Sequence, residues 1–145
     1  MKKILVTGAV GQIGSELTLE LRKRYGSDNV VAAGRKTKPS KELAGSGPFA
    51  WVDCTDAKAL AEAVEKYAID TMYHLPAILS AVAEARPQVA WNVNINGLYN
   101  ALEVCRERGC AIFVPSSIGA FGPTTPLDDT PQDTIQRPNA MYGVT

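Results

Sequence analysis

The sequence has 145 residues, of which 46% are hydrophobic and 21% charged, a composition typical of one globular domain with its own core. Fifteen basic and 15 acidic residues cancel, so the net charge gives no reason to expect a nucleic acid or an anionic membrane as partner. No apolar run approaches the roughly 20 residues that span a bilayer, and the three cysteines lack metal-site spacing. These features favour a cytoplasmic protein with free thiols and without a bound metal.

Short apolar strands are predicted at regular intervals along the chain. They cover residues 3–7, 29–33, 49–52, 71–75 and 111–115. Residues 36–48, rich in Lys, Ser, Gly and Pro, are predicted to form an exposed loop. Helical patterns alternate with the strands, and sequential parallel strands need such crossover helices. The order therefore predicts an α/β fold, a doubly wound parallel sheet of the Rossmann type, with ligands at the carboxyl ends of its strands.

Three helices are predicted between these strands. The first carries Ile13, Leu17 and Leu21 at intervals of four residues, so these side chains should form one buried stripe. The second helix should begin at Asp56, which is a suitable N-cap. The third should be a long helix from Pro87 to about Arg108, with Gly109 closing it.

The segment VTGAVGQIG places three glycines at intervals of three residues between a predicted strand and a helix. Gly8 would permit the tight turn, Gly11 would let a pyrophosphate approach the backbone, and Gly14 would let the helix pack closely on the strand. The free N–H groups at the start of the helix would then face the phosphates. This context favours dinucleotide binding over a purely structural turn.

The end of the second predicted strand bears on the choice between NAD and NADP. An acidic residue often holds the adenosine ribose at this place, but here the sequence is Gly34-Arg35-Lys36. Arg35 could pair with the 2′-phosphate of NADP or belong to a solvated basic loop, so these residues leave the choice open. Asp53, after the third strand, could accept a hydrogen bond from the adenine amino group or cap the helix that follows.

Six segments together resemble the extended short-chain dehydrogenase/reductase family, in its NAD-dependent epimerase/dehydratase group. They are VTGAVGQIG, WVDCTD, HLPAILSA, NVNING, VPSSIGAFGP and MYGVT, in the family's order and at its spacing. The segments HLPAILSA, SSIGAFGPTTP and RPNAMYGVT are most similar to the L-threonine 3-dehydrogenase branch. The resemblance implies that residues 1–145 are an incomplete N-terminal dinucleotide-binding domain. The remaining strands and the substrate lobe of the larger fold would follow Thr145.

The resemblance implies catalytic roles for Ser117, which would hold the substrate oxygen, and for Tyr142, which would take the substrate proton. A free tyrosine has a pKa of about 10, so the family adds a lysine one helical turn later, expected here directly after Thr145. Ser80 matches the position that contacts the amino-acid substrate in this branch. The expected substrate contacts are therefore Ser80, Ser117 and Tyr142. The expected cofactor contacts are Gly8, Val10, Gly11, Gln12, Ile13, Gly14, Arg35, Asp53, Cys54, Leu75, Pro76, Ala77, Asn94, Pro115 and Tyr142.

The implied reaction is oxidation of L-threonine to 2-amino-3-ketobutyrate with NAD. NADP stays possible because Gly34 stands where the branch has aspartate. In a separate departure from the family, Pro76 replaces the usual alanine. A homodimer is implied, with candidate contacts on the third helix at Leu98, Tyr99 and Leu102. Two rival functions are a nucleotide-sugar 4-epimerase or dehydratase and a non-catalytic dinucleotide-binding module.

Three further side chains invite a functional role but favour a structural one. His74, the single histidine, falls within a predicted strand and is interpreted as a core residue with its hydrogen bonds satisfied. Trp51 and Trp91 are interpreted as packing or interface residues.

Overall fold

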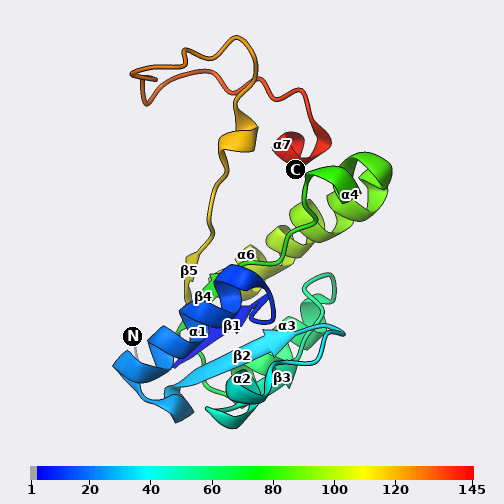
Figure 1. Ribbon diagram of the computed structural model, residues 1–145. Coiled ribbons are helices and arrows are strands. Elements are labelled where there is room, and N and C mark those ends of the chain that lie inside the picture. The colour runs from blue at the N-terminus through cyan, green and yellow to red at the C-terminus, as the bar shows by residue number, and fades with distance from the viewer. Residues whose placement is uncertain (1–2) are drawn as a thin grey trace.

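A computed structural model describes residues 3–145 and has a parallel five-stranded sheet at its centre (Figure 1). Its strands are β1 (Ile4–Thr7), β2 (Val30–Gly34), β3 (Phe49–Trp51), β4 (Thr71–His74) and β5 (Ala111–Phe113). They lie in the order β3-β2-β1-β4-β5, and every neighbouring pair is parallel. The doubly wound α/β fold is therefore confirmed, and each predicted strand is present with small shifts at its ends.

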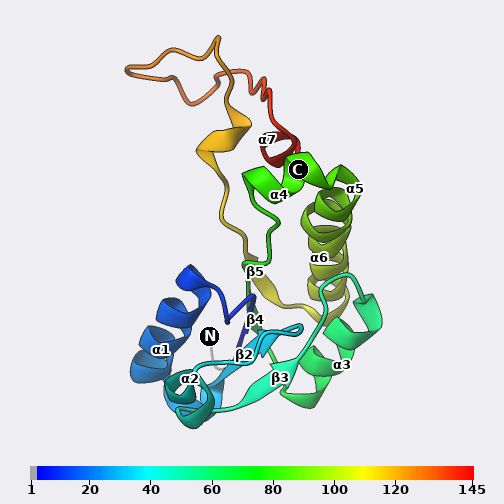
Figure 2. The same cartoon turned by 45° about the vertical axis from the view of Figure 1, so that its right-hand side comes forward.

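Helices cover both faces of the sheet, with α1 and α2 on one side and α3 and α6 on the other (Figure 2). The α-helices are α1 (Gln12–Tyr25), α2 (Lys41–Gly45), α3 (Ala57–Lys66), α4 (Ser80–Ala85), α5 (Pro87–Ala90), α6 (Gly97–Arg108) and α7 (Met141–Val144). The other helical segments are the 3-10 helices η1 (Ser27–Asn29) and η3 (Ile118–Ala120) and the π-helix η2 (Trp91–Asn96). No helix in the described part of the chain is long and apolar enough to cross a membrane.

The core is divided by the sheet into two apolar clusters. Successive strand residues point to opposite faces, so Leu5 and Met72 pack under α3 and α6. Ile4 and Val6 pack on the other face under α1 and α2. β1 is buried along its whole length, as expected for a central strand covered on both faces.

Arg22 anchors the α1 side of the molecule, although only 4% of its surface is exposed. Its guanidinium donates hydrogen bonds to the carbonyls of Val30 at 3.2 Å, Leu43 at 2.7 Å and Pro48 at 2.6 Å. It also donates to the Ser46 hydroxyl at 2.6 Å. One buried cation therefore joins α1, β2, α2 and the chain directly after α2, and burial lowers its pKa.

The segment 36–48 is not all loop, so that prediction is wrong over residues 41–45. Ser40 caps α2 by accepting a hydrogen bond from the Leu43 amide at 3.1 Å, and Leu43 is buried. The helix has only five residues, and Leu43 is its single large apolar side chain, so it shows no apolar periodicity.

The predicted long helix is confirmed over residues 87–108, where α5, the π-helix η2 and α6 follow one another without a gap. The additional helix α4 precedes them. At the far end the prediction is confirmed, since Gly109 has φ +67° and closes α6.

The predicted start of α3 is confirmed, whereas the buried stripe of α1 is only partly correct. The Asp56 carboxylate accepts from the Ala59 amide at 3.0 Å and caps α3. In α1, Leu21 is buried, but Ile13 is 69% exposed and lies beside the glycine turn.

After β5 the chain leaves the sheet as an extended segment and returns to place α7 against α4 (Figures 1 and 2). Glycines permit the close approach of this return. A Cβ atom on Gly143 would overlap the Gly119 carbonyl oxygen, and one on Gly122 would overlap the Arg137 carbonyl oxygen. The pieces of chain around η3 and α7 are therefore packed backbone to backbone.

Candidate functional site

Two clefts meet at the β1–α1 turn, where the winding of the sheet changes direction between β1 and β4. The larger has a volume of about 660 Å³ and the smaller about 210 Å³. Gly8, Pro76 and Ala77 line both, so the two form one continuous path over the turn. An elongated ligand could occupy both clefts at once.

The glycine turn has the shape that its sequence predicts. Gly8 has φ +72°, and a Cβ there would lie 2.9 Å from the Pro76 nitrogen. A Cβ on Gly14 would overlap the Gly8 carbonyl oxygen. α1 begins after Gly11 without a side-chain cap, so the N–H groups of its first turn stay available to an anion. This cradle fits the pyrophosphate of a dinucleotide.

The smaller cleft is lined by the end of β2 and by the loop after β3. A Cβ on Gly34 would lie 3.1 Å from Val10 and 3.2 Å from Phe49, so a larger side chain at this place would crowd the turn. Arg35 Nη1 lies 3.6 Å from Asp53 Oδ2, an ion pair at the mouth of the cleft.

Asp53 organises the loop after β3 rather than the start of α3. Its Oδ1 accepts from the Thr55 amide at 3.0 Å and from the Thr55 hydroxyl at 2.8 Å. Burial alone would raise the pKa of Asp53, but these hydrogen bonds and Arg35 outweigh burial and lower it. The helix-capping alternative for Asp53 is wrong, because Asp56 caps α3.

Cys54 also lines the smaller cleft and packs against α6. Burial raises the pKa of its thiol to about 11, so the thiol is neutral at physiological pH. Asn100 Nδ2 donates to its carbonyl at 3.1 Å, and a Cβ on Gly97 would lie 2.8 Å from its sulfur. The close packing gives Cys54 the character of a wall of the cleft rather than of a nucleophile.

Ser117 and Tyr142 line the larger cleft from two different segments. Ser117 Oγ caps η3 by accepting from the Gly119 amide at 3.1 Å, which leaves its hydroxyl hydrogen free for another acceptor. Tyr142 is half-buried on α7. A Cβ on Gly119 would lie 3.3 Å from both Ser117 Oγ and Tyr142 Cδ1, so the two side chains flank the same glycine.

His74 ends β4 in the wall of the larger cleft and is 3% exposed. Its Nδ1 lies 3.0 Å from the Thr7 hydroxyl. Among the buried side-chain nitrogen and oxygen atoms of residues 3–145, His74 Nε2 is the one without a hydrogen-bond partner. Burial lowers the pKa of His74 to about 4, so the ring is a neutral core group with one of its two nitrogens satisfied.

The other predicted contacts divide between the clefts, with one exception. Gly11, Gln12, Ile13, Gly14, Leu75, Asn94 and Pro115 line the larger cleft, and Val10 lines the smaller. Ser80 begins α4 and lies outside the lining of both clefts formed by residues 3–145, although its neighbour Leu79 belongs to the larger one. No group of three His, Cys, Asp or Glu side chains in the described chain could hold a metal ion.

Asn94 makes contacts that its sequence position does not reveal. Its Oδ1 accepts from the Ile78 amide at 2.7 Å, and its Nδ2 donates to the Ile78 carbonyl at 3.1 Å. Nδ2 also donates to the Thr145 hydroxyl at 2.9 Å. Thr145 is thus a lining residue that sequence reasoning missed, because no local pattern connects positions 51 residues apart.

The sequence pattern that defines the NAD dependent epimerase/dehydratase family matches residues 4–145. The chain belongs to this family. An uncharacterized epimerase/dehydratase from Staphylococcus saprophyticus is 53% identical over 144 residues, which are 99% of this chain and 45% of the relative. The resemblance inferred from the motifs is therefore confirmed.

Two solved structures of enzymes are similar to this chain. L-threonine dehydrogenase from Clostridium difficile has a TM-score of 0.95 and 55% identity, over 99% of this chain and 45% of that one. UDP-glucose 4-epimerase from Thermus thermophilus, in complex with NAD, has a TM-score of 0.83 and 27% identity, over 98% and 46%. The family and the NAD complex support a nicotinamide dinucleotide as cofactor. The chain spans less than half the length of these proteins.

Proposed function

We propose that this chain is the cofactor-binding part of an NAD-dependent L-threonine 3-dehydrogenase, which oxidises L-threonine to 2-amino-3-ketobutyrate. The observation that carries the proposal is that Ser117 and Tyr142 share one cleft with the glycine turn. Greater similarity to an L-threonine dehydrogenase than to a sugar-nucleotide epimerase supports the choice of substrate. In this assignment the catalytic residues are Ser117 and Tyr142, and Ser80 contacts the substrate.

The cofactor would lie across both clefts. The smaller cleft, with Val10, Asp53 and Cys54, would hold the adenosine half. The uncapped start of α1 and the turn at Gly8 would hold the pyrophosphate. The larger cleft would receive the nicotinamide half, within reach of the proposed catalytic pair.

NAD is the proposed cofactor, rather than NADP, because Arg35 already faces a carboxylate. A 2′-phosphate at the smaller cleft would compete with Asp53 for the Arg35 guanidinium, which lies 3.6 Å from it. Gly34 provides no carboxylate of its own to repel that phosphate. We therefore expect a preference for NAD that is moderate rather than absolute.

The chemistry asks the protein to orient an alcohol and accept its proton, while bound NAD supplies the hydride acceptor. Ser117 would donate its free hydroxyl hydrogen to the side-chain oxygen of threonine, since its lone pair already serves the Gly119 amide. Tyr142 would take the proton from the same oxygen, while the hydride on the carbon that bears this oxygen passes to NAD. The neutral, buried His74 is unsuited to this task, since burial lowers its pKa to about 4.

The test is L-threonine-dependent reduction of NAD by the full-length gene product, followed by NADH absorbance, with NADP and UDP-galactose in parallel. Threonine turnover would support the proposal. Conversion of UDP-galactose without threonine turnover would assign the protein to the epimerases.

The Tyr142→Phe variant separates an enzyme from a non-catalytic cofactor-binding module. A catalyst should lose at least about 100-fold in kcat and keep its NAD affinity, because the ring still fills its place in the cleft. Full activity in this variant would contradict the proposed role of Tyr142.

A further inference from the structure

One buried polar side chain in the wall of the larger cleft has no part in the proposed proton transfer. His74 is 3% exposed, and its Nε2 has no hydrogen-bond partner among residues 3–145. An unpaired buried donor or acceptor is costly, and nearly all such groups in folded proteins have a partner. Because His74 lines the larger cleft, the missing partner can come from a ligand bound there.

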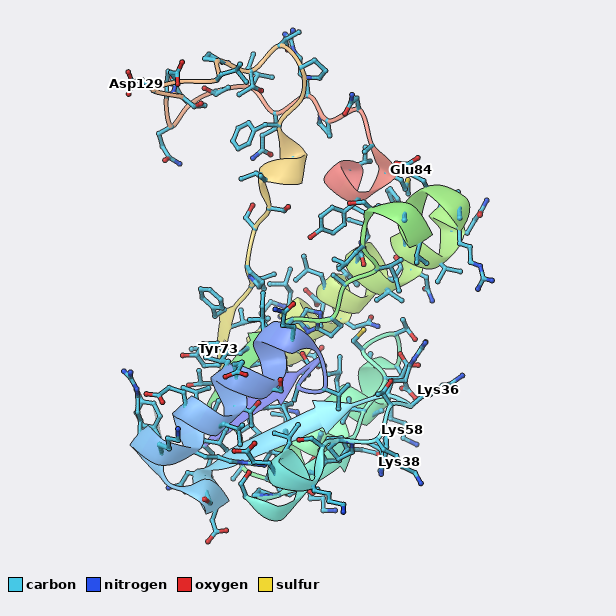
Figure 3. The ribbon with its side chains drawn as sticks, in the orientation of Figure 1. Lys36, Lys38, Lys58, Tyr73, Glu84 and Asp129 are labelled. Carbon is cyan, nitrogen blue, oxygen red and sulfur yellow. The ribbon has the colours of Figure 1, made fainter. Side chains whose placement is uncertain are left out.

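The side of the sheet on which the His74 ring lies follows from the strand pattern. Successive strand residues point to opposite faces, and Tyr73 packs in the apolar cluster on the α1 side (Figure 3). His74 therefore lies on the α6 side, like Met72 two residues earlier in β4. Thr7, the neighbour of His74 on β1, shares this face.

The contact with Thr7 determines which edge of the ring is free. Nδ1 of His74 lies 3.0 Å from the Thr7 hydroxyl on β1. The two nitrogens of an imidazole point in well-separated directions, so Nε2 is turned away from β1. β4 lies between β1 and β5, and the chain after β5, residues 114–117, lines the larger cleft. The unpaired nitrogen is thus on the ring edge that faces away from β1, on the side of this lining.

The same contact assigns the hydrogen of the ring. A hydroxyl has one hydrogen, and the Thr7 hydroxyl has two acceptors in reach, His74 Nδ1 at 3.0 Å and the Tyr73 carbonyl at 3.4 Å. The nearer acceptor, Nδ1, takes this hydrogen, so Nε2 carries the hydrogen of the neutral imidazole. Burial keeps the ring neutral by lowering the pKa of His74 to about 4. Nε2–H is therefore a donor whose acceptor is not among the described residues.

We propose that His74 donates a hydrogen bond from Nε2 to an oxygen of the nicotinamide riboside half of the cofactor. The inference rests on the proposed function, in which this half occupies the larger cleft. The ribose hydroxyls and the carboxamide carbonyl are uncharged acceptors, so the contact buries no new charge. A neutral donor also places no second positive charge beside the oxidised nicotinamide ring.

Binding of a nucleotide series to the full-length protein tests this contact. ADP contains only the adenosine and pyrophosphate groups, ADP-ribose adds the second ribose, and NAD adds the nicotinamide. His74→Leu removes both ring nitrogens at similar volume, whereas His74→Gln keeps an amide donor. Thr71→Val is the matched control, because Thr71 is a polar residue of the same strand, only 8% exposed, and lies outside the lining of both clefts.

We expect His74→Leu to weaken NAD binding by about 5- to 50-fold, because one buried acceptor loses its donor, and to change ADP binding by no more than about twofold. His74→Gln should recover part of the loss, and Thr71→Val should bind all three nucleotides like the unmodified protein. An equal loss for ADP-ribose and NAD assigns the acceptor to the ribose, whereas a loss for NAD alone assigns it to the carboxamide. Equal losses for ADP and NAD, or no loss for NAD, would overturn the proposal.

Nitrogen-15 NMR of the histidine-labelled, full-length protein tests the donor without removing it. The His74 signals are identified by their absence from the His74→Gln spectrum. Nε2 should resonate as a protonated nitrogen at neutral pH, and its signal should move on addition of NAD but not of ADP. An unprotonated Nε2, or a signal that NAD leaves in place, contradicts the proposal.

Neither measurement uses threonine, so the two hypotheses can fail separately. Absence of threonine turnover in the unmodified protein overturns the proposed substrate, and the nucleotide series then still decides whether His74 binds the cofactor.

Discussion

At Gly14 the backbone of α1 runs so close to the Gly8 carbonyl that no side chain larger than hydrogen fits. Gly14→Ala should therefore push α1 away from the turn, and displacement of the N–H groups at its start should lower NAD affinity by roughly 10- to 100-fold. Calorimetric titration of the full-length protein measures this loss.

Gly45→Ala is the control for that substitution. Gly45 lies at the end of α2, and a Cβ there meets no atom within 4 Å. Its NAD affinity should match that of the unmodified protein. Equal affinity in the Gly14→Ala variant would show that the turn does not contact the cofactor.

A pH dependence of stability should arise at His74. Its pKa is about 4 in the folded chain and about 6.5 when unfolded, so between these values the unfolded state binds more protons. Its contribution is fully present above about pH 6.5 and is lost as the pH falls toward 4, by up to about 3 kcal/mol.

Urea unfolding between pH 7 and 4.5 measures the His74 term as a difference between two proteins. Carboxylates also titrate in this range, so the comparison is with His74→Gln, which lacks the imidazole. The unmodified protein should lose more stability on acidification than the variant. Parallel curves for the two proteins would contradict a buried, neutral His74.

At the scale of secondary-structure elements, Arg22 determines how α1, α2 and β2 are joined. Arg22→Met keeps the length of the side chain but leaves the carbonyls of Leu43 and Pro48 and the Ser46 hydroxyl without their donor. Hydrogen bonds to a charged group are each worth about 1.5–3 kcal/mol, so we expect a loss of at least about 3 kcal/mol in unfolding free energy.

Chemical denaturation measures this loss, with Arg24→Met as the control. Arg24 forms an exposed pair with Glu20 at 2.6 Å on the same helix, and such pairs contribute little. Similar destabilisation in both variants would mean that the loss of helix charge, and not the buried contact, is responsible.

Secondary-structure elements are predictable from the sequence where local residues determine them. β1 and β2 are short, mainly apolar runs whose burial follows from composition. Gly109 ends α6 because its left-handed backbone conformation is a local property of glycine. α2 was missed because its stability comes from the Ser40 cap and from Arg22, which lies far away in the sequence. The π-helical turn within residues 87–108 was likewise not predicted; it contains Asn94, whose amide bonds to the Ile78 backbone.

At the scale of the whole molecule, an exposed apolar face on α6 is the candidate dimer interface. Tyr99 is 62% and Leu102 44% exposed, and their spacing of three residues places them on one side of the helix. Leu98 instead lines the larger cleft, so it is a weaker candidate than the sequence suggested.

Tyr99→Glu combined with Leu102→Glu should convert a full-length homodimer into monomers, because two charges would then be buried in the contact. Light scattering after size-exclusion chromatography measures the mass. Tyr25→Glu, on the exposed end of α1, is the control and should leave the mass unchanged. A dimer that survives the double substitution would place the interface elsewhere.

The candidate site could be predicted where a motif is local, and not where distant segments meet. Gly8, Gly14, Ser117 and Tyr142 are recognisable in short segments, and all four line the larger cleft. The contact between α4 and α7 is not recognisable in this way, since Glu84 lies 57 residues before the Met141 amide from which it accepts a hydrogen bond. This contact depends on the return of the chain after β5, which no local pattern describes.

The overlap that any side chain on Gly122 would make with the Arg137 carbonyl has a consequence for the engineering of this protein. The two ends of the segment 122–137 lie in close backbone contact, while Leu127, near the middle of the segment, is 98% exposed. Extra residues inserted near Leu127 would therefore lengthen the loop without separating its two ends. We expect that a reporter peptide inserted at this place would leave Ser117 and Tyr142 in place.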